Sequence, residues 1–253
     1  MSVTLLPSNF DALVSEAVQT FWRSRSSGST GQEGGRGSVI GGKNLDGFVE
    51  VTRAVARHCG VPAKAVFAKG KKNLTLPGYF RPHKNWDALI IWNGRLLAVL
   101  EFKSQVGSFG KNFNNRAEEV LGNATDLWTA NAEGAFAPTR HLVYEGPVPA
   151  DPRPPYLGYF MLLEDCEEST KPVTADAAHY PVAAEFREAS YADRYRILCE
   201  RLMEQGLYNA AALVMTERPP DDGSTSWRCL SPATDIRNLY AELAGRLLAA
   251  GQA

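Results

Sequence analysis

The sequence predicts an α/β protein with a mixed central β-sheet flanked by α-helices. Three observations support this class: a β-hairpin signal at Asn93-Gly94, two later apolar runs at 156–163 and 209–216, and amphipathic segments around them. Strands that alternate with helices along a chain are typical of a sheet covered by helices. The 253 residues, 44% of them hydrophobic, suffice for a sizeable core. We therefore expect a single domain over residues 1–253.

The helices are predicted from apolar residues that recur every three or four positions. Ser8 and Asn9 precede the first of these segments and suit a helix N-cap. The second segment ends near Gly60-Val61-Pro62, because glycine and proline interrupt helices. The predicted helices cover about 8–22, 45–58, 113–131, 190–205 and 234–249.

The segments between these helices are predicted to be strands or loops. The apolar runs 156–163 and 209–216 read as buried strands. Residues 24–42 are rich in Gly, Ser and charge, so we expect a flexible loop there. The basic stretch 63–84 contains the turn signal Leu76-Pro77-Gly78, with a short strand on its flank. Loops or irregular segments are also expected over 104–111, 137–155 and 219–223, and a loop or partial helix over 164–188.

Two apolar, β-prone runs lie on either side of Asn93-Gly94, a dipeptide that favours a tight hairpin turn. The first run follows Asp87, and the second leads into Glu101 and Lys103. Counted outward from the turn, Asp87 is six residues before Asn93 and Glu101 is seven after Gly94. We therefore expect the two acids to lie near each other, and Glu101 and Lys103 to share one face of their strand.

Asp87, Glu101 and Lys103 are the candidate catalytic residues. Two carboxylates can hold Mg²⁺, and an ammonium group can orient water or stabilise charge at a phosphate. The backbone carbonyl of Phe102 is a further candidate metal ligand. Glu101 also ends the apolar run 96–100, where a charge is costly to bury without a partner. The alternative interpretation is a Glu–Lys pair at a strand end beside an exposed Asp.

Other acidic residues are candidates to complete a metal site. Glu50 lies on the second predicted helix beside Phe48 and Val49, which place that turn near the core. Glu118 and Glu119 lie on the helix after the hairpin. For each of these three acids, the alternative is a solvated surface position.

Charge is unevenly distributed, although the chain as a whole carries −1. Residues 1–130 have a net charge of +6 and residues 131–253 have −7. The half with the carboxylate pair is thus the basic half, which suits a phosphate backbone. Its densest stretch interleaves cations with aromatic rings, and a solvated basic loop is the alternative. This stretch contains Lys64, Lys69, Lys71, Lys72, Tyr79, Phe80, Arg81, His83 and Lys84.

Several other kinds of site are excluded because their sequence motifs are incomplete or missing. The stretch from Gly37 to Lys43 has the spacing of a nucleotide phosphate loop, but Asn44 stands where Ser or Thr is needed, and no strand precedes it. Its backbone N–H groups remain candidates to meet a DNA phosphate or base edge. The four histidines lack metal spacing, and no acyl- or hydride-transfer motif is present.

Composition also bears on the compartment. The four cysteines contain no C-x-x-C pair, which predicts reduced, buried thiols in the cytoplasm. No run approaches 18 apolar residues, and residues 1–21 lack the basic start and apolar core of a signal peptide. We expect no membrane association.

The segments Asn85-Trp86-Asp87 and Glu101-Phe102-Lys103 resemble the site of PD-(D/E)xK nucleases, with Trp86 in place of the usual proline. Further stretches resemble XhoI-type restriction endonucleases, and the chain length suits that family. These stretches are Gly41 to Phe48, Leu76 to Pro82, Asn114 to Glu119, and Gly122 to Ala124. The resemblance is good over about 40–130 and loose in the C-terminal half.

The resemblance implies a restriction-endonuclease-like core and a prokaryotic, cytoplasmic, Mg²⁺-dependent enzyme that cuts double-stranded DNA within CTCGAG. A homodimer is expected, because a two-fold subunit pair matches a palindrome. A cognate methyltransferase would be a functional rather than a physical partner. Candidate DNA-binding residues, chosen as types that contact phosphates and bases, are Lys43, Asn44, Lys71, Lys72, Arg81, Asn114, Asn115 and Arg116.

Two other interpretations remain open. One is a PD-(D/E)xK nuclease of the same chemistry that acts in repair or on particular DNA structures. The other is a non-catalytic DNA-binding module whose carboxylates are structural. Discrete fragments from mixed plasmids would indicate sequence recognition, and binding in Ca²⁺ with turnover in Mg²⁺ would exclude the non-catalytic module.

Overall fold

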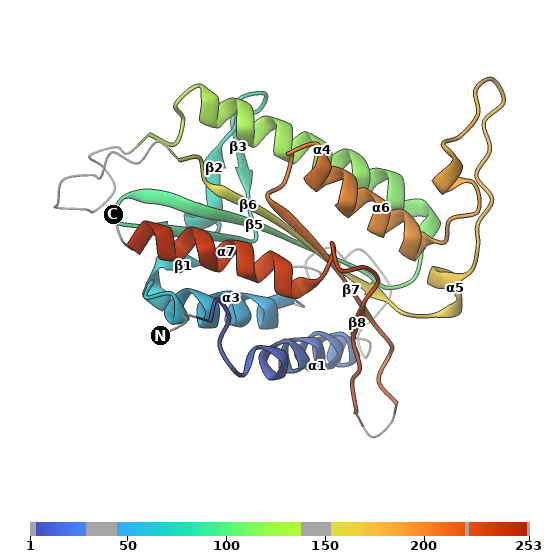
Figure 1. Cartoon of the computed structure of the whole chain (residues 1–253), viewed down its shortest axis with the longest axis horizontal. Helices are drawn as coiled ribbons and strands as arrows, with labels where there is room; N and C mark the ends of the chain where they lie inside the picture. The colour runs from blue at the N-terminus through green and yellow to red at the C-terminus, as the bar shows by residue number, and fades with distance from the viewer. Residues whose placement is uncertain (1–3, 29–44, 138–152, 221–222, 252–253) are drawn as a thin grey trace.

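A six-stranded sheet with the order β1-β4-β5-β6-β7-β8 forms the centre of the protein (Figure 1). The computed structural model describes residues 4–28, 45–137, 153–220 and 223–251. The strands are β1 (Val66–Phe67), β4 (Ala88–Trp92), β5 (Arg95–Gln105), β6 (Tyr156–Glu164), β7 (Ala210–Thr216) and β8 (Arg228–Cys229). The β5-β6 and β6-β7 pairs are parallel, and the others are antiparallel. The predicted mixed sheet is confirmed.

Helices cover both faces of this sheet. The long ones are α1 (Phe10–Gly28), α3 (Asp46–His58), α4 (Phe109–Ala132), α6 (Tyr191–Glu204) and α7 (Ile236–Gly251). The short ones are η2 (Ala63–Ala65), η3 (Lys71–Leu74), α5 (Glu167–Thr170) and η4 (Ala184–Phe186). Helices α1, α3 and α7 lie on one side, and α4 and α6 lie on the other (Figure 1).

Alternate residues of the central strand β6 feed two separate cores. Phe160 faces α3, where its ring centroid lies 4.2 Å from that of Phe48. Tyr159 points the other way and belongs to the core that contains Leu127 of α4 and Leu198 of α6. A strand buried on both faces needs a continuous apolar sequence, which is why residues 156–163 carry no polar alternation.

The predicted helices and central strands are confirmed, with shifted ends. Helix α1 continues to Gly28, so residues 24–28 of the predicted loop 24–42 are helical, and residues 29–44 lie outside the described part. Strand β5 and helix α4 shorten the predicted loop 104–111 from both sides. Strands β1 and β8 have two residues each, too few to show any periodicity in the sequence.

A separate two-stranded sheet stands beside α4 (Figure 1). It consists of β2 (Thr75–Pro77) and β3 (His83–Asn85), with Leu76 paired to Lys84. This confirms the short strand predicted next to Leu76-Pro77-Gly78. We call residues 78–82, which join the two strands, the hairpin tip.

The four cysteines are unpaired, as the sequence predicts. All four cysteines are free thiols; Cys59 and Cys199 are buried, whereas Cys166 and Cys229 are only partly covered. Among the helices that the structure describes, none has the length and apolar character needed to cross a bilayer.

Candidate active site

The β4–β5 hairpin turns at the predicted dipeptide. Asn93 and Gly94 both have positive φ, 51° and 72°, and Trp92 pairs with Arg95 across the turn. Two successive residues with positive φ are characteristic of a tight hairpin turn whose twist matches that of the strands. Asn-Gly adopts this backbone conformation at low energetic cost.

A β-bulge then sets the register that matters for the site. Between Ile90 and Ile91 the pairing skips one residue of β5, so that Ala88 pairs with Leu100. The next residues outward are Asp87 and Glu101, which therefore stand opposite each other. This confirms the proximity predicted from the unequal counts of six and seven residues from the turn. Asp87 directly precedes β4, whereas Glu101 lies within β5 rather than at its end.

The negative charge of the Asp87 carboxylate is only partly balanced by nearby donors and cations. Its Oδ2 accepts the N–H of Phe102 at 2.8 Å, and in the described part of the chain no other group donates a hydrogen bond to it. Burial raises the pKa of Asp87 above its usual value, and Lys103 and the Phe102 hydrogen bond offset only part of this effect. A bound cation would supply the missing compensation.

A cavity of about 200 Å³ opens beside this carboxylate. It is lined by apolar side chains from the start of α3, from β5 and from residues 68–86, together with two acids, Asp46 and Asp87. The lining residues are Leu45, Asp46, Val49, Ala68, Leu74, Trp86, Asp87 and Phe102. The space is thus acidic and large enough for an ion with its water molecules.

Glu101 is only 1% exposed, and both of its carboxylate oxygens are partnered. Oε1 accepts a hydrogen bond from Asn123 Nδ2 at 2.7 Å and lies 3.1 Å from Lys103 Nζ and 3.4 Å from Lys84 Nζ. Oε2 accepts a hydrogen bond from the hydroxyl of Tyr208 at 3.0 Å. An isolated carboxylate at this depth would be very costly, so these donors are what permits its burial.

Lys103 bridges acids from the sheet and from α4. Its Nζ lies 2.8 Å from Glu119 Oε1, and the other oxygen of Glu119 accepts a hydrogen bond from Arg116 at 2.8 Å. Burial lowers the pKa of Lys103, but Glu101, Asp87 and Glu119 outweigh burial, so the net pKa is raised. The ammonium group is therefore charged at neutral pH.

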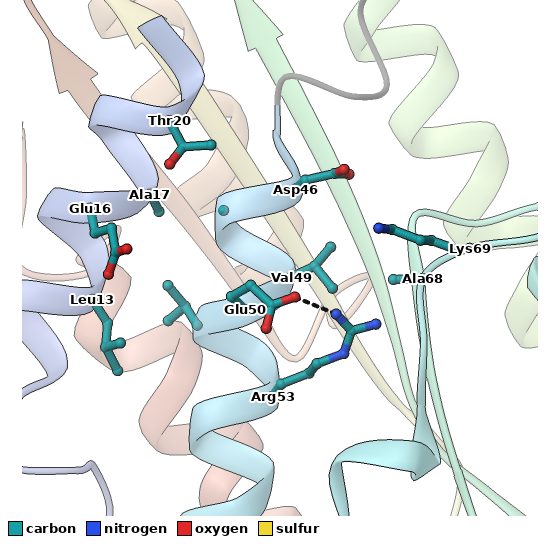
Figure 2. Close-up of a pocket in the computed structure, with 12 residues that line it drawn as sticks. Leu13, Glu16, Ala17, Thr20, Asp46, Val49, Glu50, Arg53, Ala68 and Lys69 are labelled. Atoms are coloured by element: carbon teal, nitrogen blue, oxygen red, sulfur yellow. Dashed lines mark hydrogen bonds and ion pairs between the residues drawn. The ribbon is translucent and has the colours of Figure 1, made fainter. Parts of the chain in front are cut away.

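Asp46, rather than Glu50, reaches the cavity beside Asp87. Glu50 lines a second cavity, between α1 and α3, where it forms an ion pair with Arg53 and its side chain is 62% exposed (Figure 2). Asp46, one turn earlier on α3, lines both cavities. Within the described ranges, no three His, Cys, Asp or Glu side chains gather closely enough to hold a metal ion. Water, DNA phosphate or the Phe102 carbonyl would have to complete the shell of an ion held by Asp87 and Glu101.

Some of the predicted DNA-binding residues are exposed, and others are paired with side chains of the protein itself. Lys71 and Lys72 are exposed on η3, and Asn114 and Asn115 are exposed on the first turns of α4. Lys43 and Asn44 lie outside the described residues.

Arg81 and Arg116 are engaged within the protein. Arg81 donates hydrogen bonds to Asp126 and Asn123, each at 2.8 Å, and Arg116 pairs with Glu119. Arg81 therefore holds the hairpin tip, a role that its place in a basic stretch did not indicate.

Three contacts of Glu101 were not predicted from the sequence. Asn123 carries a detectable signal, because it is a polar residue on the buried face of α4 between Val120 and Leu127. In the sequence, Lys84 is marked only as part of a basic stretch. Tyr208 lies 107 residues from Glu101 along the chain, and no local pattern connects the two.

Comparison with known proteins identifies the family of this chain. The family described as restriction endonuclease XhoI matches residues 23–226. The chain belongs to this family. It is 43% identical over 203 residues to the type II restriction enzyme XhoI of Xanthomonas vasicola, covering 78% of this chain and 77% of the relative. It is 42% identical over 210 residues to the type II restriction enzyme BstVI of Geobacillus stearothermophilus, covering 81% and 86%.

A third relative agrees with these two. The type II restriction enzyme AbrI of Azospirillum brasilense is 40% identical over 179 residues, covering 68% of this chain and 74% of the relative. No solved structure matches the chain. The restriction-endonuclease family predicted from the sequence, and with it the enzyme class, is confirmed.

Proposed function

We propose that this protein makes double-strand cuts in DNA at a short palindrome, CTCGAG, by Mg²⁺-dependent hydrolysis of a phosphodiester. Its family and its type II relatives support the enzyme class. The recognition sequence rests on the family resemblance of residues 41–48, 76–82 and 114–124. The observation that carries the catalytic part is the opposition of Asp87 and Glu101 across the β4–β5 hairpin, with Lys103 Nζ 3.1 Å from Glu101.

Asp87 and Glu101 are the residues that would hold Mg²⁺, together with the backbone carbonyl of Phe102. The donor set fits, because Mg²⁺ prefers oxygen ligands and commonly takes one or two carboxylates with water and substrate phosphate. The incomplete compensation of Asp87 also fits a cation. When bound, the ion offsets charge at the phosphorus and lowers the pKa of a water molecule.

Lys103 has the position and the charge to act on the reacting phosphate. Its ammonium group is fixed between Glu101 and Glu119, at 3.1 and 2.8 Å, so little reorganisation accompanies the reaction. We assign it the orientation of the attacking water and the stabilisation of charge on the phosphate oxygens. Water adds to phosphorus as the bond to the 3′ oxygen breaks, leaving a 5′-phosphate and a 3′-hydroxyl.

The biological setting follows from the same proposal. A palindrome has two-fold symmetry, so a homodimer with one site per strand is the matching assembly. The enzyme would act in the prokaryotic cytoplasm, beside a methyltransferase that protects the host's own sites. A monomer by sedimentation, both free and DNA-bound, would contradict the dimer.

Digestion of a fully sequenced plasmid tests the function most broadly. In Mg²⁺ we expect discrete fragments whose ends map to CTCGAG, and in Ca²⁺ binding without cleavage. Lys103→Ala, in folded protein, should give no detectable fragments. Fragments that map to another sequence would overturn the recognition site, and random degradation would overturn the restriction activity.

A further inference from the structure

The hairpin tip presents two exposed aromatic rings beside the candidate active site. Tyr79 is 54% exposed and Phe80 is 69% exposed, and their rings pack edge to face with centroids 4.9 Å apart. Single exposed apolar residues are ordinary, but an ordered pair of large rings facing water is a recurrent property of binding surfaces.

A buried acid holds the tip in this conformation. Asp126 of α4 is 4% exposed, and its Oδ1 accepts the backbone N–H groups of both Tyr79 and Phe80, each at 2.8 Å. Its Oδ2 accepts Arg81 Nε at 2.8 Å. At Gly78, an added Cβ would lie 2.6 Å from that same oxygen, so the turn admits no larger residue. The rings are therefore displayed on a preorganised loop rather than on a flexible one.

Two side chains tie the tip to Glu101. Asn123 accepts a hydrogen bond from Arg81 Nη2 at 2.8 Å and donates one to Glu101 Oε1 at 2.7 Å. Lys84, on the returning strand β3, lies 3.4 Å from the same carboxylate oxygen and 4.6 Å from the Trp86 ring centre. The position of the rings is thus fixed relative to a catalytic carboxylate.

The charge around the tip favours DNA over a second copy of the chain. His83 is exposed directly after the tip, whereas Lys84 behind it is held by Glu101. The exposed Lys71 and Lys72 lie at the far end of β2, about 10 Å along a three-residue strand. Phosphates follow one another about every 3.4 Å along each strand of a duplex, so DNA held against the tip would bring phosphates to these two lysines. In a two-fold contact the same basic patch would face itself, which is unfavourable.

We propose that Tyr79 and Phe80 are DNA-contacting residues, which place their rings against the base or sugar faces of the bound duplex beside the scissile phosphate. This inference rests on the proposed function and adds a contact that basic and amide side chains do not provide. Aromatic rings on such tips act as stacking platforms or as wedges at base steps.

The experiment measures binding of fluorescein-labelled duplexes by anisotropy in Ca²⁺. The proteins are wild type, the double variant Tyr79→Ala/Phe80→Ala, and Tyr180→Ala. Tyr180 is 81% exposed on the loop between α5 and η4 and serves as the matched control. One duplex contains CTCGAG, and the other has the same composition in scrambled order.

We expect the double variant to bind the CTCGAG duplex about 10- to 100-fold more weakly, as the loss of ring stacking on DNA predicts. Tyr180→Ala should bind like wild type. The dependence of affinity on salt should keep its slope in the double variant, because no ionic contact is removed. Thermal unfolding should match wild type, since both deleted rings face water.

Each other outcome has a distinct meaning. Equal affinity of wild type and double variant would overturn the inference while leaving the nuclease intact. A change in sedimentation of the double variant without DNA would make the pair a subunit contact and also overturn it. Wild-type protein that binds neither duplex would refute the proposed function itself, and with it this inference.

Discussion

Asp87, which stands opposite Glu101 in the hairpin, and Asp126, which Arg81 and Asn123 connect to Glu101, differ in how their charge is balanced. Burial acts to raise the pKa of each carboxyl group. At Asp126 this effect is outweighed by hydrogen bonds from the N–H of Phe80, from Arg81 and from the N–H of Tyr79, so the net pKa is lowered. At Asp87 burial prevails, and the pKa is raised. One aspartate is satisfied by the protein and organises a loop.

The other aspartate is left incompletely balanced, and that imbalance is characteristic of a binding site. A raised pKa in the folded state means that the contribution of Asp87 to stability is present below its unfolded pKa and lost as pH rises through its folded pKa. At a pH above its folded pKa, ionised Asp87 therefore costs stability in the metal-free protein. For Asp126 the sign is opposite: its contribution is present above the unfolded pKa and lost as pH falls through the folded pKa.

The largest expected effect is that of Asp87→Asn on cleavage. Plasmid cleavage in Mg²⁺ should fall by at least about 1,000-fold, because metal-assisted charge stabilisation is worth several kcal/mol. The melting temperature of the metal-free variant should rise, since the uncompensated charge is gone while the hydrogen bond to Phe102 can remain. Activity near the wild-type level would remove Asp87 from the mechanism.

Asp126→Ala should act on stability instead. Loss of a carboxylate that accepts three hydrogen bonds should lower the free energy of unfolding by about 2–4 kcal/mol, measured by urea denaturation. The exposed Asp176→Ala is the matched control and should cost less than about 0.5 kcal/mol. A change of similar size in both variants would contradict the role assigned to Asp126.

The pH dependence of metal stabilisation separates the two aspartates further. Protons compete with Mg²⁺ for Asp87, so the rise in melting temperature on adding Mg²⁺ should shrink as pH falls through the raised pKa of Asp87. Differential scanning fluorimetry across a pH series measures this rise. A rise that is independent of pH, or that persists in Asp87→Asn, would argue against this carboxylate as the ligand.

The smallest effect is expected at Glu50. Its side chain is mostly exposed and pairs with Arg53, so Glu50→Gln should change the cleavage rate by less than about twofold. Asp46→Asn is the companion variant, and we expect the larger loss there because Asp46 lines the cavity beside Asp87. A tenfold loss in Glu50→Gln with none in Asp46→Asn would reverse this assignment.

Local signals in the sequence were enough to place the candidate catalytic pair, Asp87 and Glu101, close together. Asn93-Gly94 determined the turn, and the counts of residues on its two sides brought Asp87 to Glu101. The bulge at Ile90 and Ile91 that absorbs the difference has no marker in an unbroken apolar run. Residues 156–163 and 209–216 were recognisable as strands because both faces are buried.

What escaped prediction depends on contacts between distant segments. The choice of Asp46 over Glu50 depends on how α3 is rotated, and Gly47 fixes this by packing so closely on α1 that an added Cβ would lie 2.7 Å from Ala17 Cα. The role of Arg81 in holding the hairpin tip could not be predicted, because the acid that binds it, Asp126, is 45 residues away. Tyr208 reaches Glu101 only once β7 and α6 are in place.

The most direct test of the account is calorimetric titration of Ca²⁺ into the protein bound to a CTCGAG duplex, with Glu50→Gln as a control. Wild type and Glu50→Gln should bind the ion with similar affinity, and Asp87→Asn should show binding weakened to the limit of detection. Equal Ca²⁺ affinity in Asp87→Asn and wild type would contradict the claim that Asp87 and Glu101 together form the metal site.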